Sequence, residues 1–155
     1  MLNNGLIICI AVFVVVGCGG SADTCKDLRG LAQQLRSDAN YLDQTTINEI
    51  KKASGKQQKM KILLSSEVRS LKSLEATSAR IREEAANEKL KSALLSIAQR
   101  LINLRKRNTE GLKKAIESKT FVLPDDPKGD ADFVAIEAAS RDFDQQFQAE
   151  CSKNQ

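Results

Sequence analysis

The sequence predicts an all-α domain: an antiparallel up-down four-helix bundle closed by one disulfide. The chain has 155 residues, the size of one ordinary domain, with 2 Pro and 8 Gly. After the first 20 residues it is rich in Leu, Ala, Lys, Arg, Glu and Gln, which are good helix formers. Apolar residues recur at spacings of three and four, and no alternation of period two is long enough for a strand.

The first helix is expected over residues 24–54. Asp23 or Thr24 is a suitable N-cap at its start. Gly55 can end it by adopting a left-handed conformation. Its weakest stretch is residues 40–46. The apolar stripe that predicts this helix is Leu28, Leu31, Leu35, Ala39, Leu42, Ile50 and Ala53.

The second helix is expected over residues 56–85. Its stripe is Met60, Leu64, Leu71, Leu74, Ser78, Ile81 and Ala85. Continuing this register would bring Glu88 and Ser92 to the core, but the apolar residues are Leu90 and Leu94. A phase shift of two residues therefore predicts a turn at Ala86-Asn87.

The third helix continues from Leu90 through Leu112 and Ile116, and residues 121–124 should close it. Residues 125–129 form the clearest predicted loop, and Asp130 is a suitable N-cap for a fourth helix. The apolar stripe of that helix is Phe133, Ile136, Ser140, Phe143 and Phe147.

Four Cys residues have different expected fates. Cys9 lies in the N-terminal apolar run and Cys18 directly follows it, which leaves Cys25 and Cys151 near the two ends of the folded part. In an exported protein such a pair predicts one disulfide. The bridge favours an even number of helices, because only then do the first and last residues of an up-down bundle meet at one end. Two unpaired thiols are the alternative.

Residues 6–16 are eleven consecutive apolar residues, which suits a signal peptide better than a membrane-spanning helix. The sequence Val15-Val16-Gly17-Cys18 at their end resembles the lipobox of bacterial lipoproteins. The resemblance implies that Cys18 is acylated, with chains such as palmitate, after residues 1–17 are removed. Residues 18–24 would then be the lipidated Cys and a short linker, and residues 25–155 the helical domain. A plain signal peptide with a chance Cys is the alternative.

The resemblance also implies a location. A lipoprotein of this kind is held at a membrane of the cell envelope by its lipid anchor. Gly19 stands after the Cys, where Asp would be a retention signal, so the outer membrane is expected if the host is Gram-negative. The linker of six residues reaches at most about 20 Å, so the domain should sit close to its membrane.

Positive charge is concentrated in the first three helices. Residues 23–123 carry a net charge of +9, whereas residues 124–155 carry −5. The densest basic runs, and the candidate contacts to an anionic surface, are Lys51, Lys52, Lys56, Lys59, Lys61, Arg100, Arg105, Lys106, Arg107, Lys113 and Lys114. They are either solvated helix faces or a surface for anionic lipid, cell-wall polymer or an acidic envelope protein. Nucleic acid is not expected, because the chain is exported and no recognition motif accompanies the charge.

The sequence gives no support for an enzyme, a metal or a cofactor. There is no His, which excludes Ser-His-Asp catalysis and His-ligated metals, and no catalytic or phosphate-binding motif occurs. Four Asp residues near the last loop do not have calcium-loop spacing and are better explained as loop and helix-start residues: Asp125, Asp126, Asp130 and Asp132. The Phe residues of the fourth stripe are expected in the core, with an apolar pocket as the alternative.

The expected function is therefore non-catalytic: a membrane-anchored lipoprotein that acts as an interaction or structural module of the envelope. The alternative is a helical-bundle carrier of an apolar ligand or lipid. The two differ in their interiors, because a carrier needs a cavity of roughly several hundred Å³ whereas an interaction module should be packed solid.

Overall fold

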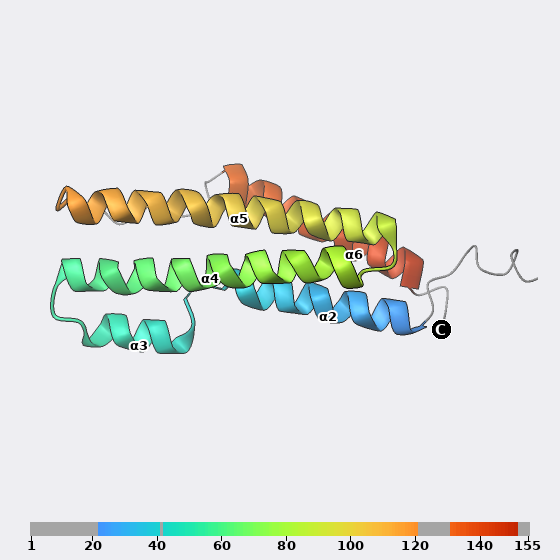
Figure 1. Ribbon diagram of the computed structural model, residues 1–155, viewed down its shortest axis with the longest axis horizontal. Helices are drawn as coiled ribbons and strands as arrows, with labels where there is room; N and C mark the ends of the chain where they lie inside the picture. The colour runs from blue at the N-terminus through green and yellow to red at the C-terminus, as the bar shows by residue number, and fades with distance from the viewer. Residues whose placement is uncertain (1–21, 41, 121–130, 152–155) are drawn as a thin grey trace, which may run out of the picture.

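The computed structural model describes residues 22–40, 42–120 and 131–151, which form five α-helices and contain no strand (Figure 1). The helices are α2 (Ala22–Ala39), α3 (Gln44–Lys52), α4 (Lys56–Glu84), α5 (Glu88–Glu117) and α6 (Ala131–Cys151). The prediction of an all-α helical bundle with one disulfide is confirmed. The number of helices differs from the prediction, because the first predicted helix is broken in two.

The break falls in the stretch predicted to be weakest. The backbone N–H of Thr46 donates to the side chain of Asp43 at 2.6 Å, so Asp43 caps a new helix, α3. This backbone hydrogen bond is also the main reason that the pKa of Asp43 is lowered. Leu42, predicted to be in the core, is instead exposed in the connection. Gly55 does not end a helix in a left-handed conformation: its φ of −145° is extended, and it stands at the N-cap of α4.

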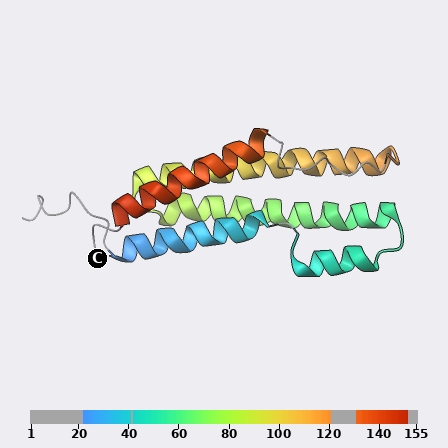
Figure 2. The ribbon, with the colours of Figure 1, turned by 180° about the vertical axis from the view of Figure 1, so that it is seen from behind.

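The core is formed mainly by α2, α4, α5 and α6 (Figure 2). Leu28 and Leu35 of α2 pack with Leu74 and Ile81 of α4 at almost zero exposure. The other buried apolar side chains of this cluster include Leu90, Leu94, Ile97, Ala98, Leu101, Ile136 and Phe143. Most of the predicted stripe positions are therefore in the core. The helix α3 contributes less, because it packs only on the first half of α4.

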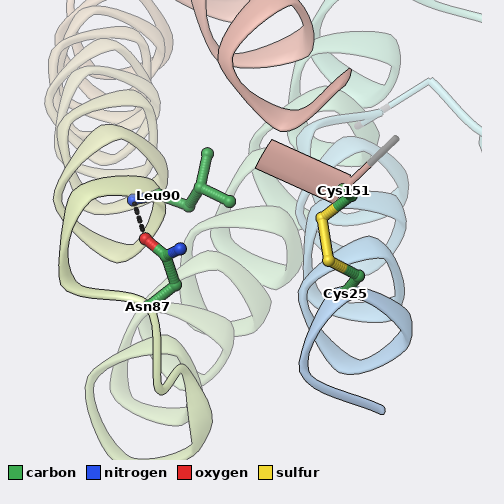
Figure 3. The surroundings of a disulfide bond; sticks show 4 residues. All are labelled: Cys25, Asn87, Leu90 and Cys151. Atoms are coloured by element: carbon green, nitrogen blue, oxygen red, sulfur yellow. Dashed lines mark hydrogen bonds between the residues drawn. A yellow bond between two sulfur atoms is a disulfide. The ribbon is translucent and has the colours of Figure 1, made fainter. Parts of the chain in front are cut away.

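The predicted turn between the second and third helices is confirmed at residues 85–87. The side chain of Asn87 accepts a hydrogen bond from the backbone N–H of Leu90 at 3.0 Å and so caps α5 (Figure 3). The helix α4 ends at Glu84, and the cap at Asn87, three residues later, starts α5 without Gly or Pro, which explains the phase shift in the apolar pattern.

The disulfide Cys25–Cys151 is present, with a Cα–Cα distance of 5.9 Å. It joins the start of α2 to the end of α6, close to the α4–α5 turn (Figure 3). We call this the disulfide end. The α3–α4 connection and the end of α5 lie at the opposite end, the far end (Figure 1). Because α4 has 29 residues and runs from one end to the other, the two ends are about 43 Å apart.

Candidate functional site

Seven lysines of the predicted basic set collect at the far end of the bundle. They come from the last turn of α3, the first two turns of α4 and the last two turns of α5, and all of them are exposed. None of them forms an ion pair within the described residues. We call them the far-end lysines: Lys51, Lys52, Lys56, Lys59, Lys61, Lys113 and Lys114.

The far end as a whole is strongly positive. Residues 44–64 and 106–120 carry ten basic and three acidic side chains, a net charge of +7. The three acids are Glu49, Glu110 and Glu117, all exposed. By contrast, residues 131–151, which form α6 and lead to the disulfide end, carry one basic and five acidic side chains. The charge of the molecule is therefore divided along its long axis.

The remaining sequence-predicted basic residues are placed differently. Lys106 lies 3.3 Å from Glu75 of α4, and Arg107 lies 2.5 Å from Asp132 of α6, so both form ion pairs between helices. Arg100 is exposed and lies nearer the disulfide end of α5 than the far-end lysines do. The far-end lysines are therefore the members of the predicted set that lie at one end of the bundle and form no ion pair within the described residues.

Arg105 is a correction to the predicted set, because it is buried and cannot contact a surface. It is 6% exposed. Its Nη1 donates to both carboxylate oxygens of Glu67, at 3.1 and 3.2 Å, and its Nη2 donates to the backbone oxygen of Ala39 at 2.5 Å. Asn108 also donates to Glu67. The guanidinium thus connects α5 with α4 and with the last residue of α2.

Glu67, the buried partner of Arg105, is not among the residues predicted from the sequence. Its side chain is 3% exposed, and burial raises its pKa even though Arg105 and Asn108 act in the opposite direction. A signal for it exists in the sequence: Met60, Glu67, Leu74 and Ile81 are each seven residues apart, and the other three are buried. Ala98, Arg105 and Leu112 form a second such series on α5. Each series contains one charged residue among buried apolar residues, and two such series on neighbouring helices indicate a buried ion pair.

A second buried carboxylate holds the junction between α2 and α3. Asp38 accepts hydrogen bonds from Gln34, Ser73 and Thr77 at 2.8, 2.9 and 2.5 Å. The hydroxyl of Ser70 donates to the backbone oxygen of Asp38, which occupies the end of α2. Because these groups satisfy one another, the cluster fixes where α2 stops against α4. The sequence alone predicts no role for Asp38.

An apolar pocket of about 220 Å³ lies between α2, α5 and α6. Phe133 and Phe143, two members of the predicted Phe stripe, line it, while Phe147 packs on Phe143 and under the guanidinium of Arg29. The other lining residues include Leu35, Leu94, Leu101 and Ile136. The polar side chains on its walls are Arg36, Arg105 and Ser140. The interior is therefore neither packed solid nor as hollow as a carrier of several hundred Å³.

Several predicted sites lie outside the described residues. They include the signal sequence, Cys18, and the loop residues Asp125, Asp126 and Asp130. Asp132, the fourth acid of that group, pairs with Arg107. Within the described ranges, no helix is both long and apolar enough to span a bilayer, and no three His, Cys, Asp or Glu side chains gather as metal ligands would.

Comparisons with known proteins give no relative: no protein-family model matches the chain, and neither a curated protein nor a solved structure does. The functional assignment therefore depends on the residues and on their arrangement.

Proposed function

We propose that the protein is a membrane-anchored lipoprotein of the bacterial cell envelope, and that it acts without catalysis as an interaction or structural module. In this proposal α2 and α3 together form the first rod of an antiparallel up-down four-helix bundle. The lipobox-like sequence ending at Cys18 is the basis for the anchor, and the far-end lysines are the basis for the interaction.

The observation that supports this proposal best is the separation of the two ends. Cys18 precedes Ala22, the first residue of α2, by four positions, so an anchor there reaches at most about 14 Å from the disulfide end. The far-end lysines of α4 and α5 lie about 35–43 Å from that end. In this proposal the linker brings the start of the domain close to the membrane but leaves the lysines away from it. A bundle standing on its anchor presents them away from that membrane.

Replacing Cys18 by Ser is expected to abolish acylation and release the protein from membranes, because the thiol is the proposed acceptor of the diacylglycerol. Labelling cells with radioactive palmitate and fractionating them measures both effects. Cys9→Ser is the matched control: it changes a Cys that the proposal assigns to the removed signal peptide, and should leave labelling intact. Palmitate on the Cys18→Ser protein, or no palmitate on the wild type, would contradict the anchor.

The apolar pocket favours one further candidate function, the binding of a small apolar molecule. An engineered cavity of about 150 Å³ lined by Leu, Ile and Phe is large enough to bind benzene. The pocket of about 220 Å³ has a similar lining of Leu, Ile and Phe side chains, so a ligand of benzene size or slightly larger fits it.

For this candidate, benzene or toluene is expected to raise the melting temperature in proportion to the logarithm of its concentration above the dissociation constant. Ser140→Leu fills the pocket from its wall and should remove the effect. Ser96→Leu is the control, because Ser96 is an exposed Ser of α5 outside the pocket. Equal stabilisation of wild type and Ser140→Leu in a thermal melt would exclude binding in this pocket.

A further inference from the structure

We propose that the far-end lysines bind a linear polyanion, a polymer that carries repeated negative charges along its chain. This inference deepens the proposed function by naming the chemical class of the partner. It rests on the proposed function in one respect only, the position of the far end relative to the membrane. The binding chemistry itself is argued from the described residues alone.

The lysines are not explained by helix stability. A helix favours cations at its C-terminus and anions at its N-terminus, because of its macrodipole. Lys51, Lys52 and Lys114 fit this rule at the ends of α3 and α5. Lys56 and Lys59 contradict it: they lie in the first turn of α4, which contains no acidic residue. Positive charge is therefore kept at the far end even where it works against the helix.

The lysines are also not used inside the fold. None of the seven has a carboxylate within ion-pair distance among the described residues. Lys89, Lys91 and Lys106 elsewhere do, and Lys26 and Lys72, which also form no ion pair in the described fold, lie apart from each other on different helices. Three helix ends bring the seven together, and only three exposed acids accompany them. A cluster of like charges repels itself, and an external polyanion removes that repulsion.

The composition of the far end fits a polymer better than a protein partner. Protein interfaces are anchored by buried Trp, Tyr, Arg or large apolar side chains, and they are depleted in Lys. Among the described residues the exposed large apolar side chains are Leu42 and Val134, which lie in the α2–α3 connection and near the start of α6. The far end therefore has charge without an apolar anchor. Lys side chains are flexible point charges that accept many anion geometries, as a repeating polymer requires.

The position of the far end fits a polymer better than the anchoring membrane. The potential of a charged bilayer falls off over a Debye length of about 8 Å at physiological salt. The lysines of α4 and α5 are about 35–43 Å from the end that leads to Cys18. A polymer that extends through the space beside the membrane can reach them there.

The test uses the full-length chain, purified in a neutral detergent and titrated with fluorescently labelled inorganic polyphosphate of about 100 units. We expect binding whose dissociation constant rises at least about 50-fold between 50 and 200 mM salt, the change expected when four or more phosphates are neutralised on a single-stranded polymer. The variant with Lys56, Lys59, Lys113 and Lys114 all changed to Gln should bind at least about tenfold more weakly and show a shallower salt dependence.

The matched control removes the same number of charges elsewhere. It changes four exposed basic residues to Gln that lie away from the far end and form no ion pair in the described fold: Lys26, Lys72, Arg82 and Arg100. This control should lose less than about threefold in affinity. Circular dichroism should show both variants to be as helical as the wild type, because all eight side chains are solvated.

Four results would overturn the proposal. The first is that the wild type shows no salt-sensitive binding, and the second is that both quadruple variants are weakened equally. The third is that phosphatidylglycerol nanodiscs displace polyphosphate at equal phosphate concentration. The fourth is that free inorganic phosphate displaces it at that concentration. The last two would assign the lysines to a lipid surface or to a single anion. None of them depends on acylation, so failure of the Cys18→Ser experiment and failure of this one are distinguishable.

Discussion

Changing Cys25 and Cys151 together to Ser should lower the free energy of unfolding by about 5 kcal/mol, according to the loop-closure model for two residues separated by 126 positions. The disulfide lowers the conformational entropy of the unfolded chain, and removing it restores that entropy over almost the whole domain. Measured effects are often smaller than the model value, so a loss of about 2–5 kcal/mol is expected. Urea unfolding followed by circular dichroism at 222 nm measures it.

The wild type provides its own control in this experiment. A reductant should lower the urea midpoint of the wild type to that of the double variant and leave the variant unchanged. Hydrogen exchange should show where the loss occurs: α6 packs on α5 and only slightly on α2, so its amides should lose protection first. A variant as stable as the oxidised wild type would mean that helix packing alone holds α6 in place.

The apolar pattern of the sequence predicts most of the core because burial and periodicity are directly related in a helix. Leu28, Leu74, Ile81 and Leu94 are all predicted core positions, and all are almost fully buried. The turn at residues 85–87 is predicted for the same reason, since two successive helices need not share a register. The pairing of Cys25 with Cys151 is predicted because Cys9 is expected to be removed and Cys18 to be acylated, which leaves these two.

The break between α2 and α3 could not be placed by periodicity alone. The stripe resumes at Ile50 and Ala53 with helical spacing, so it suggests one helix. The deciding interactions are local caps and long-range hydrogen bonds. Asp43 starts α3, and Ser70 and Ser73 of α4 bind the end of α2 through Asp38. The cap can be recognised in the sequence, but the contacts from α4 depend on tertiary structure.

The candidate binding site could be predicted in part. The far-end lysines are in the basic runs of the sequence, and their exposure follows from their charge. Arg105 stands in one of the same runs but is buried, because Glu67 meets it from another helix. Charge density along the chain does not distinguish a solvated cation from a paired one. The two series of positions seven residues apart do distinguish them, because each series contains one charged residue among buried apolar residues.

Replacing Glu67 by Ala should be the most damaging single substitution of a polar residue in the described fold, with a loss of about 3–5 kcal/mol. The buried guanidinium of Arg105 would lose both of its hydrogen bonds to Glu67, and Asn108 would lose an acceptor as well. The change also leaves a cavity. Chemical unfolding of the variant measures the loss. Glu75→Ala is the matched control, because Glu75 pairs with Lys106 at the surface, where an ion pair contributes about 0–1 kcal/mol.

Glu67→Gln separates the charge of this carboxylate from its hydrogen bonds. A Gln side chain still offers an oxygen to Arg105, so the loss should be clearly smaller than for Ala. The pH dependence has a defined sign. Burial raises the pKa of Glu67, so the folded protein holds a proton there at a pH at which the unfolded chain has released it. The contribution of this group to stability must therefore increase as the pH falls through the window above the ordinary pKa of Glu.

The difference in unfolding free energy between wild type and Glu67→Gln isolates this contribution, because all other carboxylates are common to both proteins. Measured from pH 7 down to pH 4.5, the difference should shift in favour of the wild type. A shift in favour of Gln would mean that attraction by Arg105 outweighs burial and lowers the pKa of Glu67. In that case the pair stabilises the fold by its charge. With the expected sign, the pair stabilises it through hydrogen bonds that join α5 to α4 and to the end of α2.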